Sequence, residues 1–184
     1  GDVYKRQVDD TEIGKNTYLD NQVHMAHNVK IGSNCMIAGQ VGFAGSTTIG
    51  NNVSIGANTT IDRGSISSTE IHDGVKIDNL IHIAHNVVIG EDTAIAAKTG
   101  IAGSTKIGKR CMIGGAVGIV GHLNITDDVI INATSTVNRN ISKPGIYTGF
   151  MPIMLHSEWK KVGIWLTKLD KIANFMKIKL RNIR

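Results

Sequence analysis

The chain has 184 residues, of which 41% are hydrophobic but only 4% aromatic, with 21 glycines and a formal net charge of +5. No apolar run approaches the roughly 18 residues of a membrane span, and the chain is too apolar for a disordered protein. Two cysteines cannot build a disulfide framework, so we expect Cys35 and Cys111 to be reduced structural thiols in a cytoplasmic protein. Residues 1–7 hold no apolar signal segment, and we treat them as a non-native leader.

A six-residue repeat follows this leader. Every sixth residue from Ile13 to Ile61 is large and apolar, and after a shift of four residues the same holds from Ile71 to Val137. An amphipathic helix, with a period of 3.6, would drift off this frame within one turn. A strict period of six, with small residues after the apolar ones, predicts a parallel β-helix of about seven three-sided coils over residues 8–143.

The repeat is interrupted once and then ends. The shift falls within residues 62–70, whose Gly, Ser and Thr content predicts a loop extruded from one corner. Pro144 and Gly145 end the repeat, and residues 144–184 are predicted to form a helical extension. Its apolar residues recur at helical spacing between residues 157 and 181, with Ser157 as the predicted N-cap.

The positive charge belongs to this extension. Residues 151–184 hold eight Lys or Arg and two acidic residues, a balance of +6, whereas residues 1–150 hold twelve basic and thirteen acidic residues, a balance of −1. Three interpretations stay open: a solvated helix face, a docking site for an acidic protein such as acyl carrier protein, and a peripheral contact with an anionic membrane surface. No nucleic-acid-binding motif accompanies the charge, so we expect no nucleic-acid partner.

Histidines mark a long internal duplication. Residues 19–50 match residues 77–108 at 18 of 32 positions, with an offset of 58 residues. In the second copy, His122 follows His85 by two coils and one residue. The position equivalent to His122 in the first copy is Gly64. A site with two histidines is therefore predicted only around the second copy.

The same spacing predicts the position of one glycine, and three further histidines are interpreted from their places in the repeat. Gly103 follows His85 by one coil and is predicted to lie between the two histidines. We interpret His27, which lacks a second histidine, as a corner residue. His24 and His82 are interpreted as surface or interface residues.

Motifs in the second copy resemble a known family in both order and spacing. They are TTIDRG (59–64), IDNLIHIAHNVVIG (77–90), IAGSTKIG (101–108), KRCMIGGAVGIVGHL (109–123) and SKPGIYTGF (142–150). The family is the UDP-3-O-acylglucosamine N-acyltransferases, hexapeptide-repeat enzymes of lipid A biosynthesis. The resemblance implies a left-handed β-helix and the following roles: His85 as catalytic base, His122 as second active-site histidine, Asp78 and Asn79 as supporting residues, and Gly103 as a backbone oxyanion donor.

The resemblance also implies a reaction and an assembly. The enzymes move a 3-hydroxyacyl chain from acyl carrier protein to the 2-amine of UDP-3-O-acylglucosamine, and the resemblance implies a homotrimer with sites between subunits. The donor brings its own phosphopantetheine, so we expect neither a cofactor nor a metal. The family carries an N-terminal uridine-binding domain that we do not expect in this chain.

The chemistry suits these residue types, although alternatives stay open. The attacking amine must lose a proton, for which histidine is a base poised near neutral pH, and a backbone N–H can hold the developing oxyanion. The alternatives are a coenzyme A-dependent acetyltransferase, a trimeric scaffold without turnover, and a zinc hydrolyase of carbonic anhydrase type. The zinc enzyme would need His82, His85 and His122 to converge across an interface.

Overall fold

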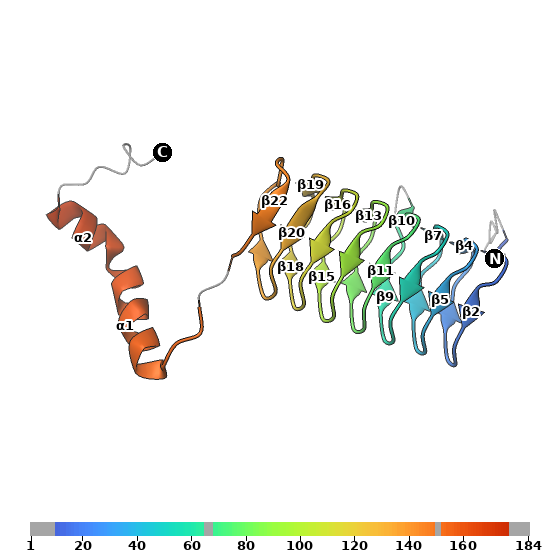
Figure 1. Cartoon of the computed structure of the whole chain (residues 1–184), viewed down its shortest axis with the longest axis horizontal. Helices are drawn as coiled ribbons and strands as arrows, with labels where there is room; N and C mark the ends of the chain where they lie inside the picture. Colours follow the sequence, from blue (N-terminus) through green and yellow to red (C-terminus); the bar gives the residue numbers. More distant parts are fainter. Residues whose placement is uncertain (1–9, 65–67, 150–151, 177–184) are drawn as a thin grey trace, which may run out of the picture. The chain divides into compact units, whose positions relative to one another are not determined.

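The computed structural model describes residues 10–64, 68–149 and 152–176. The chain forms two compact units, Gly1–Phe150 and Met151–Arg184, and each is described by itself. In the first unit, strands of two or three residues stack coil upon coil into three parallel sheets (Figure 1). The expected leader, residues 1–7, lies outside the described residues.

Each sheet takes one strand from every coil. Sheet A contains β1 (Glu12–Ile13), β4 (Lys30–Ile31), β7 (Thr47–Ile49), β10 (Thr69–Ile71), β13 (Val88–Ile89), β16 (Lys106–Ile107) and β19 (Asn124–Ile125). Sheet B contains β2 (Tyr18–Leu19), β5 (Met36–Ile37), β8 (Ser54–Ile55), β11 (Lys76–Ile77), β14 (Ala94–Ile95), β17 (Met112–Ile113), β20 (Val129–Ile131) and β22 (Gly145–Tyr147). Sheet C contains β3 (His24–Met25), β6 (Gly42–Phe43), β9 (Thr60–Ile61), β12 (His82–Ile83), β15 (Gly100–Ile101), β18 (Gly118–Ile119) and β21 (Thr136–Val137).

The register of these sheets follows the hexad count. Ile13 pairs with Ile31, one coil of three hexads later. Where β7 pairs with β10, the partners are Thr47 and Thr69, so this coil holds four extra residues. The structure thus confirms a parallel β-helix of about seven coils, and the four-residue shift predicted in residues 62–70 is the excursion between β9 and β10.

The hexad apolar residues fill the interior. From Ile31 onward these side chains are at most 7% exposed, and Ile83 and Ile89 are fully buried. A glycine follows many of them because the next coil lies directly above: a Cβ on Gly32 would lie 2.6 Å from the carbonyl carbon of Gly50. Small residues at this position are therefore a packing requirement of the coil stack.

The two cysteines lie in this interior. Cys35 and Cys111 are both fully buried and free. Burial raises the pKa of the Cys111 thiol, which keeps it protonated and unreactive at neutral pH.

Most described corners of the prism use one residue with a left-handed backbone. At the corner between sheets C and A these are Asn28, Ser46, Asn86, Ser104 and His122, with φ between 59° and 61°. The conformation is sterically costly for residues other than Gly, although Asn tolerates it best. Because the same backbone conformation recurs at the regular corners of the described coils, the left-handed backbone of His122 is a property of the fold.

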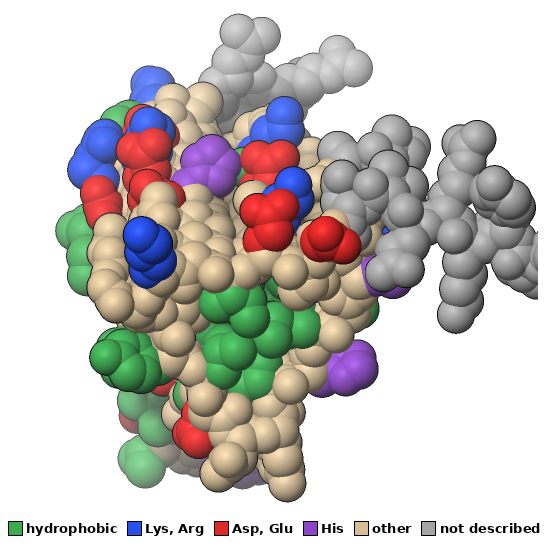
Figure 2. Space-filling model, turned by 90° about the vertical axis from the view of Figure 1, so that its right-hand side faces the viewer, with side chains coloured by type: hydrophobic (Ala, Val, Ile, Leu, Met, Phe, Trp, Pro, Cys, Tyr) green, Lys and Arg blue, Asp and Glu red, His purple; other side chains and the backbone are tan. Residues whose placement is uncertain are grey.

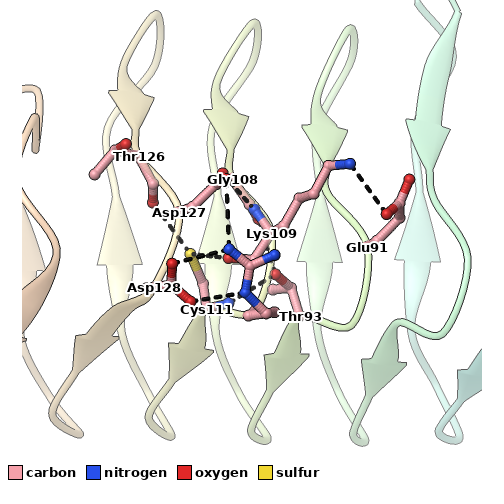
Figure 3. A network of polar contacts seen from close by, with 9 residues as sticks. Glu91, Thr93, Gly108, Lys109, Cys111, Thr126, Asp127 and Asp128 are labelled. Atoms are coloured by element: carbon pink, nitrogen blue, oxygen red, sulfur yellow. Dashed lines mark hydrogen bonds and ion pairs between the residues drawn. The ribbon is translucent and has the colours of Figure 1, made fainter.

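Charged side chains form a ladder at the corner between sheets A and B (Figure 3). Arg110 donates two hydrogen bonds to Asp128, at 2.8 and 2.9 Å, and Lys109 pairs with Glu91 at 3.0 Å. The carboxylate of Asp128 raises the pKa of Arg110, and the guanidinium lowers the pKa of Asp128. These pairs link consecutive coils, but they are exposed and so contribute little stability.

The two ends of the coil stack differ. At the β1 end, Ile13 is 45% and Leu19 38% exposed, and Figure 2 shows hydrophobic side chains gathered there within a polar rim. At the other end, Val137 and Ile141 are buried, and β22 pairs with β20. Residues 144–149 therefore belong to the β-helix unit, so the boundary predicted at residue 143 lies too early.

The second unit contains two short helices, α1 (His156–Thr167) and α2 (Leu169–Phe175). Helix α1 begins one residue before Ser157, and its N-cap Leu155 makes no side-chain capping bond, so the predicted N-cap is wrong. Neither helix buries a side chain within the chain. No helix among the described residues is long and apolar enough to cross a membrane.

Candidate functional site

His85, Gly103 and His122 meet at one corner, between sheets C and A. His82, Gly100 and Gly118 are register partners on adjacent strands, so residues three positions later in each coil, among them His85 and Gly103, stack in one column. The N–H of His122 donates to the carbonyl oxygen of Gly103 at 2.9 Å. The expected order, with Gly103 between the two histidines, is what the structure shows.

The ring of His85 lies against Gly103. A Cβ on Gly103 would lie 2.5 Å from His85 Nε2 and 3.0 Å from its Nδ1, so a side chain at this position would have to displace the ring. The N–H of Gly103 donates no hydrogen bond to any atom of the described chain. An imidazole and an unused backbone donor are thus adjacent, as a base and an oxyanion donor need to be.

The other nitrogen of His85 has a partner that sequence reasoning missed. His85 Nδ1 lies 3.0 Å from Oδ1 of Asn86. The signal was present in the sequence, because Asn86 follows the histidine and occupies the left-handed corner position.

His122 lies farther along the same corner. It is exposed, and its backbone is two coils from that of His85, or roughly 10 Å at the usual strand spacing. The two imidazoles therefore do not form a directly bonded pair. They border a stretch of corner long enough for an extended ligand, with Gly103 in the middle.

Asp78 and Asn79 lie at a different corner, between sheets B and C. One side of the prism, β12, separates them from His85. Asp78 Oδ1 accepts a hydrogen bond from the N–H of Asn79 at 2.8 Å. Within one chain, the structure does not bring these two predicted site residues together with the histidines.

Asn79 caps a backbone N–H group of the preceding coil, as equivalent side chains do elsewhere in the stack. Its Oδ1 accepts the N–H of Ala57 in the preceding coil at 2.8 Å. Asp73 does the same for Asn51 at 2.7 Å, and that hydrogen bond is the main reason why the pKa of Asp73 lies below its ordinary value. Asn79 is therefore one of a series of side chains that cap the N–H groups of neighbouring corners.

Two hollows of the surface lie on sheet B. Two shallow cavities of about 460 and 540 Å³ follow this sheet, and Asp78 borders both. The lining includes Met112 in one and Met36 with Tyr18 in the other. The Asp78 corner thus adjoins two hollows lined mostly by apolar side chains.

The first copy reproduces part of the histidine corner. A Cβ on Gly45 would lie between 2.7 and 3.1 Å from the ring of His27, the same ring-on-glycine packing as at His85. His82 is on the outer face of sheet C, with Nδ1 2.9 Å from Thr60 Oγ1 and Nε2 3.5 Å from Asp62. The described residues include no cluster of three or more His, Cys, Asp or Glu placed to hold a metal ion.

Comparisons with known proteins agree with the repeat. The family model for bacterial transferase hexapeptide (six repeats) matches residues 10–45 and 68–103. The chain is similar to the UDP-3-O-acylglucosamine N-acyltransferase of Aromatoleum aromaticum, at 55% identity over 61% of this chain and 34% of that protein. The enzyme of the same name from Herminiimonas arsenicoxydans is 50% identical over 59% of this chain and 31% of its own length.

Solved structures show the same fold. The chain resembles LpxA from Acinetobacter baumannii, with a TM-score of 0.63 and 20% identity over 85% of this chain and 67% of that one. UDP-N-acetylglucosamine acyltransferase from Campylobacter jejuni gives a TM-score of 0.58 and 20% identity over 76% of this chain and 67% of that one. The matches to the curated relatives above cover about a third of their length. The chain is thus a parallel β-helix of transferase hexapeptide repeats that is similar in sequence to part of the UDP-3-O-acylglucosamine N-acyltransferases.

Proposed function

We propose that this chain carries the acyl-transfer site of an N-acyltransferase that moves a 3-hydroxyacyl group from acyl carrier protein to the 2-amine of UDP-3-O-acylglucosamine. The observation that carries the proposal is the adjacency of the His85 imidazole and the unused N–H of Gly103. The named relatives support the substrate class, since two of them share half or more of their aligned residues with this chain.

The proposed reaction needs one base and one oxyanion donor. The amine nitrogen attacks the thioester carbonyl carbon while His85 Nε2 takes the amine proton, and the N–H of Gly103 binds the carbonyl oxygen as it becomes negative. The tetrahedral intermediate then collapses, the carbon–sulfur bond breaks, and the imidazolium returns its proton to the leaving thiol. The products are the amide and the free phosphopantetheine thiol of the carrier protein.

The other predicted site residues have places in this scheme. His122 lies two coils along the corner and is proposed to orient the pantetheine arm or to share in oxyanion stabilisation. Asp78 would contribute only from another copy, with its corner and the sheet B hollow beside the His85 corner of a neighbouring subunit. This is the arrangement that a cyclic homotrimer with sites between its subunits would provide.

The basic extension has a role in the same proposal. Four exposed lysines give this unit a positive surface. Lys160 and Lys161 lie on α1, Lys168 lies between the two helices, and Lys171 lies on α2. Such a surface attracts acyl carrier protein, which the proposal takes as an acidic partner, and speeds the encounter at low salt.

The test is thiol release from 3-hydroxyacyl-carrier protein in the presence of UDP-3-O-acylglucosamine. We expect acceptor-dependent release that His85→Ala abolishes and that His27→Ala, its matched control in the first copy, leaves unchanged. Turnover with acetyl coenzyme A in place of the carrier-bound donor would favour the acetyltransferase. Absence of release from a folded oligomer would contradict the proposal and favour a scaffold, and zinc-dependent activity would favour the hydrolyase.

A further inference from the structure

The orientation of His85 depends on one neighbouring side chain. The carboxamide oxygen Oδ1 of Asn86 lies 3.0 Å from His85 Nδ1. A carboxamide oxygen can only accept a hydrogen bond, so Nδ1 carries the proton in this arrangement. The lone pair of the neutral ring is then on Nε2, the nitrogen that a base at this corner must use.

Asn86 is itself held through its backbone. Its N–H donates to the hydroxyl of Thr69 at 3.0 Å, and that hydroxyl donates to the carbonyl oxygen of Asp62 at 2.7 Å. Thr69 is fully buried, which protects both hydrogen bonds from water. A continuous series of hydrogen bonds therefore runs from Asp62 through Thr69 and Asn86 to His85.

This series closes the base of the loop in residues 62–70. In the preceding coil, the hydroxyl of Thr47 donates to the carbonyl oxygen of Ala44, three residues earlier, at 2.9 Å. Thr69 makes the equivalent bond to Asp62, seven residues earlier, because the four extra residues lie between them. Asp62 and Thr69, on either side of the four extra residues, are thus joined by the hydroxyl that holds Asn86.

The first copy shows that the tripeptide Ala-His-Asn alone does not produce this arrangement. Oδ1 of Asn28, the residue equivalent to Asn86, is buried without a hydrogen-bond partner. The hydroxyl of Thr11, equivalent to Thr69, donates to the carbonyl oxygen of Ala26 at 3.3 Å. Two identical tripeptides therefore differ in the hydrogen bonding of their Asn side chains, and the copies also differ in how the equivalent threonine is bonded.

We propose that Asn86 is a positioning residue that holds His85 in the Nδ1–H tautomer, and that Thr69, anchored on Asp62, fixes Asn86 in place. The inference rests on the proposed function in one respect: it assigns Nε2 of His85 as the base. Asp62 and Thr69, which flank the four extra residues, then have a definite task, which is to fix the residue that orients His85.

The tautomer can be measured without turnover. We would record long-range ¹H–¹⁵N spectra of the full chain with labelled histidine, assigning His85 by its loss in His85→Gln. We expect the Nδ1–H tautomer for His85, and a shift toward Nε2–H in Asn86→Ala and in Thr69→Val. Asn28→Ala is the matched control and should leave the His85 signals in place. An Nε2–H tautomer in the unaltered chain, or no change in either variant, would overturn the proposal.

The kinetics give a second, independent readout. Asn86→Ala should lower kcat roughly 10- to 100-fold with little change in KM, as is usual when a group that orients a functional histidine is removed. Asn86→Asp keeps an acceptor but adds a negative charge beside the imidazole, which favours its protonated form and should move the acid limb of the kcat/KM profile to higher pH. A folded Asn86→Asp with an unmoved profile would contradict the positioning role. Absence of activity in the unaltered chain would contradict the proposed function but not the positioning role of Asn86, since the tautomer of His85 is measured without turnover.

Discussion

The imidazole of His85 lies so close to the Cα of Gly103, in the next coil, that a methyl group at position 103 would overlap the ring. The glycine is thus a steric requirement of the histidine. The same glycine presents an N–H that no described atom accepts. The imidazole and this N–H are therefore fixed relative to one another by packing alone, without a side-chain hydrogen bond between them.

Gly103→Ala should displace the ring of His85. We expect acyl transfer to fall at least 100-fold, because the base and the donor both move, and stability to fall by about 1 kcal/mol from overpacking. Gly45→Ala makes the equivalent clash with His27 and should cost similar stability without loss of turnover. Steady-state kinetics of the two variants measure the loss of turnover, and thermal unfolding at one protein concentration measures the loss of stability. Equal losses of turnover in both would contradict the assignment of the second copy as the site.

Gly100→Ala serves as the open-surface control. A Cβ on Gly100 would meet no atom of its own chain within 4 Å. We therefore expect unchanged unfolding and unchanged kinetics from this variant, which shares the coil of Gly103.

Asn79→Ala tests whether the residue supports the site or the fold. The carboxamide caps the N–H of Ala57, and its loss should destabilise the chain by about 1 kcal/mol. Asn51→Ala removes the equivalent cap on Ser33 and is the matched control. If both variants lose stability alike and retain kcat, Asn79 is a corner cap only. A fall in kcat confined to Asn79→Ala would restore its predicted part in catalysis.

The fold was accessible from the sequence because one physical constraint acts on every coil. The interior admits one aliphatic side chain per side, so Ile83, Ile89 and Ile95 recur at six residues, and the backbone of the next coil forbids large residues after them. The four-residue shift could be located in the sequence for the same reason. The start of α1 could not be predicted in this way, since Ser157 is a residue type that favours an N-cap but lies inside the helix.

The site was accessible only in part. Spacing in whole coils placed His85, Gly103 and His122 together correctly. Asp78 lies seven residues before His85, which is one side of the prism, so the same arithmetic would have put it at the neighbouring corner. The Asn86 bond depends on rotamers and on the Thr69 anchor, which no periodicity specifies.

The pH dependence of stability should include a contribution from Asp73. The N–H of Asn51 lowers the pKa of this carboxyl in the folded chain. A lowered folded pKa stabilises the fold above the unfolded value, near 4, and this contribution is lost as the pH falls through the folded value. Asp73→Asn keeps an acceptor for the N–H but cannot titrate, so its stability should fall less steeply below pH 4. Unfolding midpoints between pH 6 and 3 measure the difference, and parallel curves would refute it. Since Asp73 is exposed, solvent screening keeps the effect small.

A site shared between subunits predicts complementation. His85→Ala and Asp78→Ala should each be inactive, yet in mixed trimers an intact His85 corner can meet an intact Asp78 corner. For random assembly of equal amounts in a cyclic trimer, about a quarter of the interfaces combine the two intact corners, so about a quarter of the unaltered activity should return. The variants are co-refolded, checked for mass as trimers by sedimentation, and assayed for thiol release. Activity that never exceeds the mean of the two separate variants would contradict a site that takes His85 from one subunit and Asp78 from the next.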